Sequence, residues 1–227
     1  MTGSRAPVKV TLYVDTVSPF GYEAYYILRN DPVFSKCEIT YIPVFLGGIM
    51  KACGNIAPIS IKNKDKWINT ERLRWATLFN IPMQTETPPN FPPMTLTIMR
   101  SLCAFTILHP GKEGQGILTK TLDTLFKAYW VEHRKTHEKD VLSELLGEVL
   151  GREEGGKVLE IAAKEGKELL AKNTDQAMAD GAFGLPWFVA TNSQGETEGF
   201  WGVDHLARLT EFLGLERPKM GGWKALL

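Results

Sequence analysis

The stretch VKVTLYVDTVSPFG, which runs from Val8 to Gly21, decides the fold that the sequence predicts. Its first half, Val8–Val14, alternates and is rich in β-branched residues, a pattern typical of a strand. Ser18 is a favoured N-cap, and Pro19 is favoured at the first helical position. The stretch therefore predicts a strand followed directly by a helix.

The residues after this stretch extend the pattern to β-α-β. Asp31-Pro32 is expected to close the helix, and Glu38–Phe45 (EITYIPVF) predicts the next strand. Pro43 suits a strand end or a sheet edge, because proline cannot donate to a ladder. Such a start favours an α/β fold with parallel pairing and a right-handed crossover.

The middle of the chain, from about Lys64 to Ala179, shows helical periodicity. Apolar residues at this spacing predict helices over Trp67–Leu78, Leu102–Leu108, Leu118–Tyr129, Val141–Leu150 and Val158–Leu170. Between the first two, Pro88–Pro93 holds four prolines in six residues and predicts a stiff loop.

The last 45 residues return to β structure. Leu185–Ala190 predicts a strand, Asn192–Gly195 a turn, Glu196–Trp201 a hairpin partner and Asp204–Leu213 a terminal helix. The whole order predicts an α/β thioredoxin fold with an all-helical domain inserted in its middle. We expect residues 1–55 and 180–227 to form the two parts of the thioredoxin fold, and residues 56–179 the insertion.

Composition narrows the function classes. Lys+Arg and Asp+Glu both number 26, so the formal net charge is zero, which argues against a nucleic-acid-binding surface. The content of 44% hydrophobic and 23% charged residues is ordinary for a soluble globular protein. No stretch approaches the ~20 apolar residues that span a bilayer, so we expect no membrane association.

The three cysteines and the two ends of the chain bear on its compartment. Cys37, Cys53 and Cys103 form neither a Cys-x-x-Cys pair nor zinc-ligand spacing, so we expect reducing surroundings and no metal. The N-terminus has no apolar signal core, and Ala225-Leu226-Leu227 lacks the basic middle residue of a peroxisomal signal. The expected location is cytoplasmic, with mitochondrial or peroxisomal as alternatives.

The turn Ser18-Pro19-Phe20-Gly21 lies where thioredoxin folds carry a reactive Cys-x-x-Cys, at a helix N-terminus that stabilises thiolates. Both cysteine positions hold other residues, which disfavours dithiol oxidation. The Ser18 hydroxyl can instead donate a hydrogen bond to the thiolate of a bound thiol and so raise the share of the reactive anion. The alternative is that Ser18 only caps the helix.

A second candidate site is Gly184-Leu185-Pro186, just before the third strand. Here we expect a cis peptide bond at Pro186, which turns the backbone of Leu185 toward the Ser18 turn. That backbone can then pair with an extended peptide ligand as an added strand does.

Two weaker candidates lie elsewhere in the chain. In Gly47–Asn55 paired glycines permit tight turns, and an amide together with Lys64 suits a carboxylate; the alternative is a solvated loop. Asp204, which opens the last predicted helix, either caps that helix or meets an amino group.

Together these residues resemble the kappa-class glutathione transferases and the bacterial 2-hydroxychromene-2-carboxylate isomerases, over nearly the whole chain. The resemblance rests on YVDTVSPF (Tyr13–Phe20), GIMKACGN (Gly48–Asn55) with Lys64, IPM (Ile81–Met83), GAFGLP (Gly181–Pro186) and Gly202–Asp204. It implies a DsbA-like fold, glutathione as cosubstrate and a homodimer.

The resemblance also implies roles for single residues. Ser18 is the expected hydrogen-bond donor to the glutathione sulfur. Asn55 and Lys64 are expected near the glycyl end. The backbone of Leu185, before Pro186, is expected to pair with the cysteinyl unit. Val203, through its backbone, and Asp204 are expected to meet the γ-glutamyl end.

The sequence departs from the family at several points. Val203 stands where a serine is common, which removes a hydroxyl from the γ-glutamyl site, and Gly21 stands where a second serine is usual. Pro88–Pro93 is unlike the family's loop, which leaves the choice of electrophile open. Cys53, inside the expected glutathione-binding loop, is interpreted as a small packed residue, with a mixed disulfide as the alternative.

The sequence therefore predicts an enzyme that binds glutathione, stabilises its thiolate through Ser18 and adds it to a small electrophile. Three alternatives stay open: a glutathione-dependent cis-trans isomerase, a thiol-disulfide oxidoreductase that relies on Cys53, and a thioredoxin-like module without catalysis.

Overall fold

The computed structural model describes residues 7–226. Residues 1–6, on which the expectation about a signal segment depends, lie outside the described residues, as does Leu227 of the C-terminal tripeptide. The strands are β1 (Lys9–Val14), β2 (Glu38–Pro43), β3 (Trp187–Thr191) and β4 (Thr197–Trp201). The helices are α1 (Pro19–Asn30), α2 (Leu46–Ala52), α3 (Lys64–Leu78), α4 (Leu96–Leu108), α5 (Lys112–Phe126), α6 (Lys139–Leu150), α7 (Arg152–Ala163), α8 (Glu165–Ala179), α9 (Leu206–Phe212) and α10 (Gly222–Ala225).

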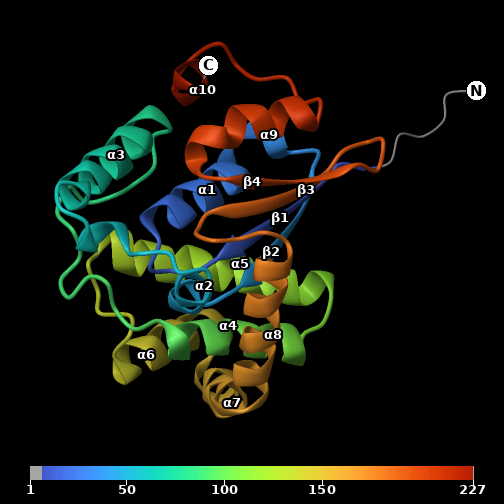
Figure 1. Ribbon diagram of the computed structural model, residues 1–227. Helices are drawn as coiled ribbons and strands as arrows, with labels where there is room; N and C mark the ends of the chain where they lie inside the picture. Colours follow the sequence, from blue (N-terminus) through green and yellow to red (C-terminus); the bar gives the residue numbers. More distant parts are fainter. Residues whose placement is uncertain (1–6, 227) are drawn as a thin grey trace, which may run out of the picture.

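The four strands form one mixed sheet in the order β2-β1-β3-β4 (Figure 1). β1 and β2 are parallel, while β3 pairs antiparallel with both β1 and β4. Pro43 is the last residue of the edge strand β2. The predicted β-α-β start and the later hairpin are therefore confirmed, and so is the thioredoxin-type fold.

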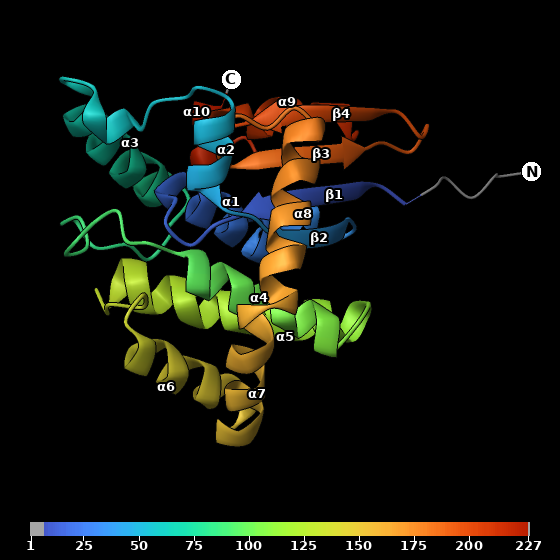
Figure 2. The same cartoon turned by 60° about the horizontal axis from the view of Figure 1, so that its bottom comes forward.

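Both faces of the sheet are covered, because successive side chains of a strand point to opposite faces. On β1, Leu12 belongs to the large core that includes residues of α1 and α9, whereas Tyr13 belongs to a second cluster with residues of α2 and α8. Figure 2 shows α2 and α8 on one side of the strands. α8 continues away from the sheet into the block formed by α4, α5, α6 and α7 (Figure 1).

The single helix expected over Val158–Leu170 is wrong: the chain breaks at Lys164 into α7 and α8. The reason is close packing at Gly166, where an added Cβ would lie 2.4 Å from the carbonyl oxygen of Arg100. α8 therefore starts in close contact with α4.

The loop alternative for Gly47–Asn55 is also wrong for most of its length, because Leu46–Ala52 is the helix α2. Its glycines serve packing rather than turning. A Cβ on Gly47 would lie 2.9 Å from the ring of Phe45, the N-cap residue of this helix.

Other predicted helices exist with shifted ends. α4 begins at Leu96 rather than Leu102, and α5 ends at Phe126 in a π-helical turn, Lys127–Val131. Pro88–Pro93 lies outside helices and strands, as expected. Within residues 7–226, no helix combines the length and hydropathy needed to cross a membrane.

Candidate functional site

Four loop segments, one next to each strand, meet at the same end of the strands. In the strand register Val14 pairs with Pro43, Tyr13 with Trp187, and Trp187 with Trp201. The residues that follow β1, β2 and β4 therefore leave the sheet where the chain before β3 enters it. This topology brings together the Ser18 turn, the start of α2, Leu185-Pro186 and Gly202–Asp204.

Ser18 caps α1, as the sequence predicts. Its Oγ accepts a hydrogen bond of 3.0 Å from the amide of Gly21, and the residue is 4% exposed. Since Oγ acts as an acceptor in this bond, the hydroxyl hydrogen stays available for an anion at the helix N-terminus. Both interpretations of Ser18, cap and donor, are therefore compatible in one geometry.

Leu185-Pro186 is a cis peptide bond, as predicted. The carbonyl of Pro186 accepts a hydrogen bond of 3.1 Å from the amide of Gly202. Among the described residues, neither the amide nor the carbonyl of Leu185 has a hydrogen-bond partner. The backbone of Leu185 is thus free to pair with an extended ligand.

Asn55 contacts the same segment. Its side-chain amide donates a hydrogen bond of 2.8 Å to the carbonyl of Phe183, two residues before Leu185. An added Cβ on Gly184 would lie 3.2 Å from Nε1 of Trp201, so a larger residue at 184 would crowd the indole. The structure therefore joins the end of α2 to the segment that precedes β3.

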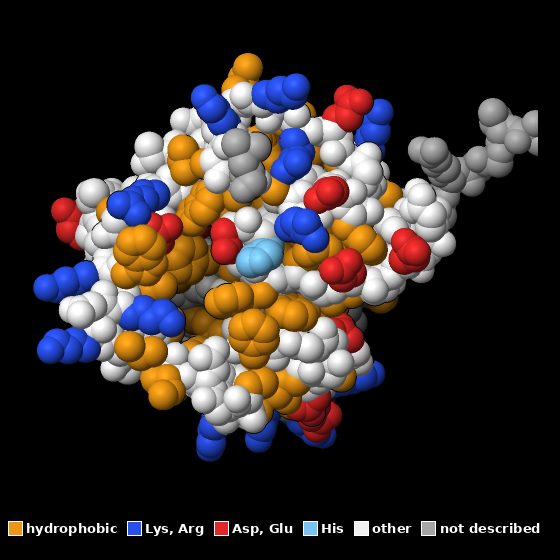
Figure 3. All heavy atoms as spheres, turned by 45° about the horizontal axis from the view of Figure 1, so that its top comes forward, with side chains coloured by type: hydrophobic (Ala, Val, Ile, Leu, Met, Phe, Trp, Pro, Cys, Tyr) orange, Lys and Arg blue, Asp and Glu red, His pale blue; other side chains and the backbone are white. Residues whose placement is uncertain are grey.

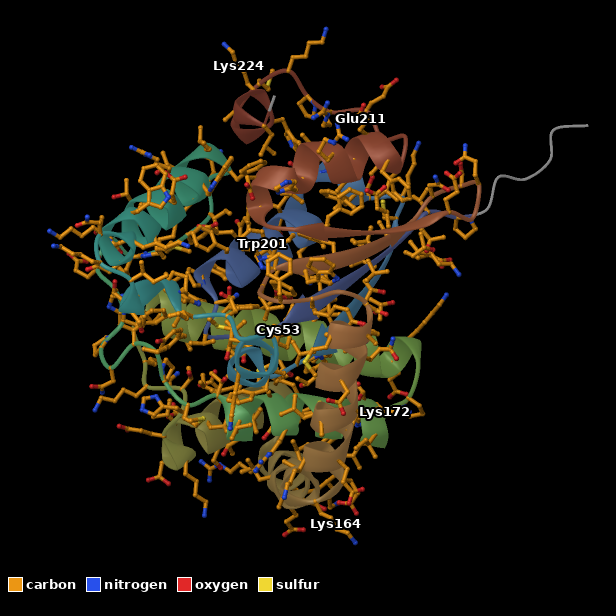
Figure 4. All side chains as sticks on the ribbon, in the orientation of Figure 1. Cys53, Lys164, Lys172, Trp201, Glu211 and Lys224 are labelled. Atoms are coloured by element: carbon orange, nitrogen blue, oxygen red, sulfur yellow. The ribbon has the colours of Figure 1, made fainter. Side chains whose placement is uncertain are left out.

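Cys53 is exposed, so its interpretation as a packed residue is wrong. It follows the last residue of α2 in the sequence, and the next residue, Gly54, turns the chain with a positive φ. Its Sγ lies 3.5 Å from the carbonyl oxygen of Ala182. Figure 4 shows Cys53 and Trp201 near each other, at the ends of α2 and β4.

The remaining predicted residues are Lys64, Val203 and Asp204. Lys64 is the first residue of α3 and is exposed, and its side chain has no hydrogen bond to another predicted site residue within the described chain. Val203 is buried, whereas the Asp204 side chain is 60% exposed and lies 3.4 Å from Nδ1 of His205.

The cap interpretation of Asp204 is wrong. A 3-10 turn, Val203–His205, precedes α9, and its N-cap is Gly202, without a side-chain hydrogen bond. An added Cβ at Gly202 would lie 2.2 Å from Oδ1 of Asp204, so glycine allows this carboxylate its position.

The sequence reasoning missed Asp15 as a site residue. It follows β1 directly and is fully buried, and its carboxylate accepts hydrogen bonds from the amides of Val17 and Leu46 and from the hydroxyl of Thr95. Burial raises the pKa of this carboxyl to about 6, although the three hydrogen bonds oppose the rise. A polar residue between a buried strand and a helix cap was the available signal.

A groove of about 550 Å³ lies beside Pro19, the residue next to Ser18. Its walls include Ile59, Phe91 and Trp130, and Arg72 also lines it. On the face shown in Figure 3, hydrophobic side chains border a hollow. Charged and polar side chains, among them Asp65, Lys66 and Asn69, complete the lining, so the groove next to the helix N-terminus is aromatic on one part and polar on another.

Comparison with known proteins agrees with the fold. Residues 9–214 match the family model described as a DSBA-like thioredoxin domain. The chain belongs to this family. Since the match covers most of the sequence, the DSBA-like domain includes both the sheet and the helical block between β2 and β3.

Among curated members, glutathione S-transferase kappa 1 from Caenorhabditis elegans is 24% identical over 92% of each chain. Glutathione S-transferase kappa 1 from Homo sapiens is 27% identical, also over 92% of each. A solved 2-hydroxychromene-2-carboxylate isomerase has a TM-score of 0.73 and 25% identity, covering 91% of this chain and 94% of that one. The similarity extends over nearly the full length of each relative.

Proposed function

We propose that this DSBA-like protein is a glutathione transferase that activates the glutathione thiol at Ser18 and joins it to a small electrophile. The observation that carries the proposal is the geometry of Ser18. Its Oγ accepts the capping bond from Gly21, so its hydrogen can be donated to a sulfur anion at the N-terminus of α1. Both the hydrogen bond and the helix dipole favour the thiolate.

The other parts of glutathione are assigned to residues that lie near the same end of the strands. The amide and carbonyl of Leu185, which have no partner among the described residues, support pairing with the cysteinyl unit. We assign Asn55 and Lys64 to the glycyl carboxylate. We assign the backbone of Val203 and the exposed carboxylate of Asp204 to the γ-glutamyl end.

The groove beside Pro19 is the proposed place of the electrophile. Phe91 and Trp130 meet edge to face, with ring centroids 5.7 Å apart, and Ile59 adds aliphatic surface. Together with the polar lining residues Lys66 and Asn69, such walls suit a small aromatic molecule that carries polar groups, and catalysis would rest on positioning it beside a stabilised anion.

Glutathione-dependent isomerisation is the second candidate, favoured by the solved isomerase that shares this fold at a TM-score of 0.73. In that reaction the thiolate adds reversibly to a conjugated carboxylate and leaves after bond rotation. Because the first steps coincide, a chromene carboxylate and a halonitrobenzene should be assayed side by side.

Calorimetric titration with reduced glutathione tests the proposal directly. We expect saturable binding by the wild type. For Ser18→Ala we expect weaker binding and a bound-thiol pKa raised by about one unit, the size of one hydrogen bond to a charged group. Unchanged turnover of Ser18→Ala at pH 6.5, or no binding at millimolar glutathione, would contradict the proposal.

We also propose a homodimer. The exposed side chains of Ile56, Phe183 and Trp201 support an apolar contact surface on this protein. Sedimentation equilibrium distinguishes the dimer from a monomer, and a single species of 25.4 kDa would contradict it.

A further inference from the structure

Asp15 is a buried carboxylate without an assigned role, three residues before Ser18. Its Oδ1 accepts a hydrogen bond of 3.2 Å from the amide of Val17, and its backbone carbonyl accepts one of 3.1 Å from the amide of Ser18. Side chain and backbone of Asp15 therefore close the turn that sets the position of Ser18.

The other carboxylate oxygen reaches two further segments. Oδ2 of Asp15 accepts a hydrogen bond of 2.9 Å from the amide of Leu46 and one of 3.1 Å from the hydroxyl of Thr95. Leu46 is the first residue of α2, and Thr95 is the N-cap residue of α4. One carboxylate thus links the Ser18 turn to α2 and to the helical block.

The link to α2 matters because Asn55 follows this helix. Asn55 in turn contacts the carbonyl of Phe183, close to Leu185. Asp15 is therefore hydrogen-bonded to both segments that contribute to the proposed glutathione site, the Ser18 turn and the α2–Asn55 segment.

The contacts favour the ionised carboxylate. From the β1–α1 turn, α2 and α4, the groups that meet it are Val17, Leu46 and Thr95, and none of these is titratable. The amides of Val17 and Leu46 can only donate, so neither can accept a hydrogen bond from a protonated carboxyl. The Thr95 hydroxyl can rotate to accept this hydrogen bond. Protonation therefore weakens the link to at least one amide.

We infer that the ionised carboxylate of Asp15 is a positioning group, which holds the Ser18 turn against α2, so that affinity at the glutathione site falls when Asp15 is protonated. The burial that raises the pKa of Asp15 to about 6 places this loss in mildly acidic solution. The inference rests on the proposed function for its ligand, although not for its geometry.

S-methylglutathione is the appropriate probe, because it has no ionisable thiol. We expect its affinity for the wild type to fall by about threefold from pH 7.5 to pH 5.5, as protonation of Asp15 would produce. In Asp15→Asn we expect weaker binding at pH 7.5 and a nearly flat profile. Since all other titrating groups are common to both proteins, the difference between the profiles reports Asp15.

Asp31→Asn is the matched control. Asp31 also accepts an amide hydrogen bond two residues along the chain, from Val33 at 3.0 Å, but it lies at the other end of α1. Asp31→Asn should keep the affinity and the pH profile of the wild type. Wild-type and Asp15→Asn profiles of equal slope would overturn the inference.

A measurement without ligand separates this inference from the proposed function. In the free protein, the amide proton shifts of Val17 and Leu46 should titrate together by NMR, and this titration should vanish in Asp15→Asn. If the wild type binds no S-methylglutathione, the proposed function fails and these amides alone decide the role of Asp15. Amide shifts that stay flat through pH 5 to 7.5 would overturn it.

Discussion

Trp130 donates its indole N–H to the carbonyl of Thr16 over 3.1 Å, and so ties a wall of the groove to the turn that carries Ser18. The guanidinium of Arg72 lies over the same ring, 5.9 Å from its centroid. Trp130 comes from the π-helical turn after α5, far from Ser18 in sequence. This hydrogen bond therefore couples the position of the groove wall to the position of the Ser18 turn.

Trp130→Phe should lower both stability and turnover. One aromatic ring is kept, but the smaller side chain leaves a cavity at this buried position, and the carbonyl of Thr16 loses its donor. The lost donor alone costs about 1–3 kcal/mol. We expect kcat/KM to fall by about tenfold as the Ser18 turn loosens. Trp223→Phe is the control: it removes a comparable bond, from Nε1 to Asp31 at 2.7 Å, on the small helix α10. An equal loss of kcat/KM in both variants would contradict the coupling.

Gly21→Ala should impair catalysis with little effect on stability. An added Cβ would lie 3.0 Å from Cβ and 3.2 Å from Oγ of Ser18, so it displaces the proposed donor. The gain of about 1 kcal/mol in helix propensity offsets the crowding, and we expect kcat/KM to fall by about tenfold.

Gly116→Ala controls for the helix propensity, because Gly116 lies in α5 and an added Cβ there meets nothing within 4 Å. It should raise the melting temperature and leave the kinetics unchanged. If Gly21→Ala behaves in the same way, Ser18 tolerates the added methyl and the close approach has no functional meaning.

Asn55→Ala should act on binding rather than on chemistry. The variant loses the 2.8 Å bond to Phe183 and the amide assigned to the glycyl carboxylate. We expect KM for glutathione to rise by about fivefold with kcat nearly unchanged, since both contacts exist in the ground state. Asn30→Ala, which removes a surface amide bonded to the Tyr26 carbonyl, is the control. A fall in kcat alone would count against the assignment of Asn55.

Local signals were sufficient for much of the fold and for one half of the site. The β-branched run before Ser18-Pro19 predicted β1, the cap and α1, because strand period and capping chemistry act over a few residues. The cis bond at Pro186 depended on its expected place before the third strand.

What the sequence left hidden depends on contacts between distant segments. Gly47 was taken for a turn residue, whereas its neighbour across the helix start is the ring of Phe45. Thr95 and Trp130 contact the turn before Ser18 from positions 80 and 114 residues away in the sequence, and no local pattern marks such contacts. Exposure of Cys53 likewise follows from where α2 ends.

Cys53 should be the one cysteine of the described chain that reacts readily with iodoacetamide at pH 8. It is exposed, whereas burial raises the pKa of the Cys37 thiol to about 11 and that of Cys103 to about 12. Mass spectrometry should find one label per chain, and none in Cys53→Ser. Loss of thiol-disulfide activity in Cys53→Ser would revive the oxidoreductase alternative, and labelling of Cys103 would contradict its burial.

The free energy of unfolding should fall as the pH rises from about 4 to about 6, through the titration of Asp15. Its folded pKa, about 6, lies above the ordinary 3.8, so between these values the folded protein binds more protons than the unfolded chain. Stability must then decrease with rising pH, by up to about 3 kcal/mol for this shift. Burial also raises the pKa of Glu23, which adds a fall of the same sign.

Urea unfolding of wild type and Asp15→Asn at pH 4.5, 5.5, 6.5 and 7.5 isolates the share of Asp15. The carboxamide keeps one acceptor oxygen, so either the Val17 or the Leu46 amide loses its acceptor. The variant should therefore be less stable than the wild type at pH 4.5, where the wild-type carboxyl is mostly protonated. Its deficit should shrink, or reverse, by about 1–3 kcal/mol at pH 7.5. If the difference in the free energy of unfolding between the two proteins stays constant from pH 4.5 to pH 7.5, Asp15 does not titrate in this range, and the prediction is wrong.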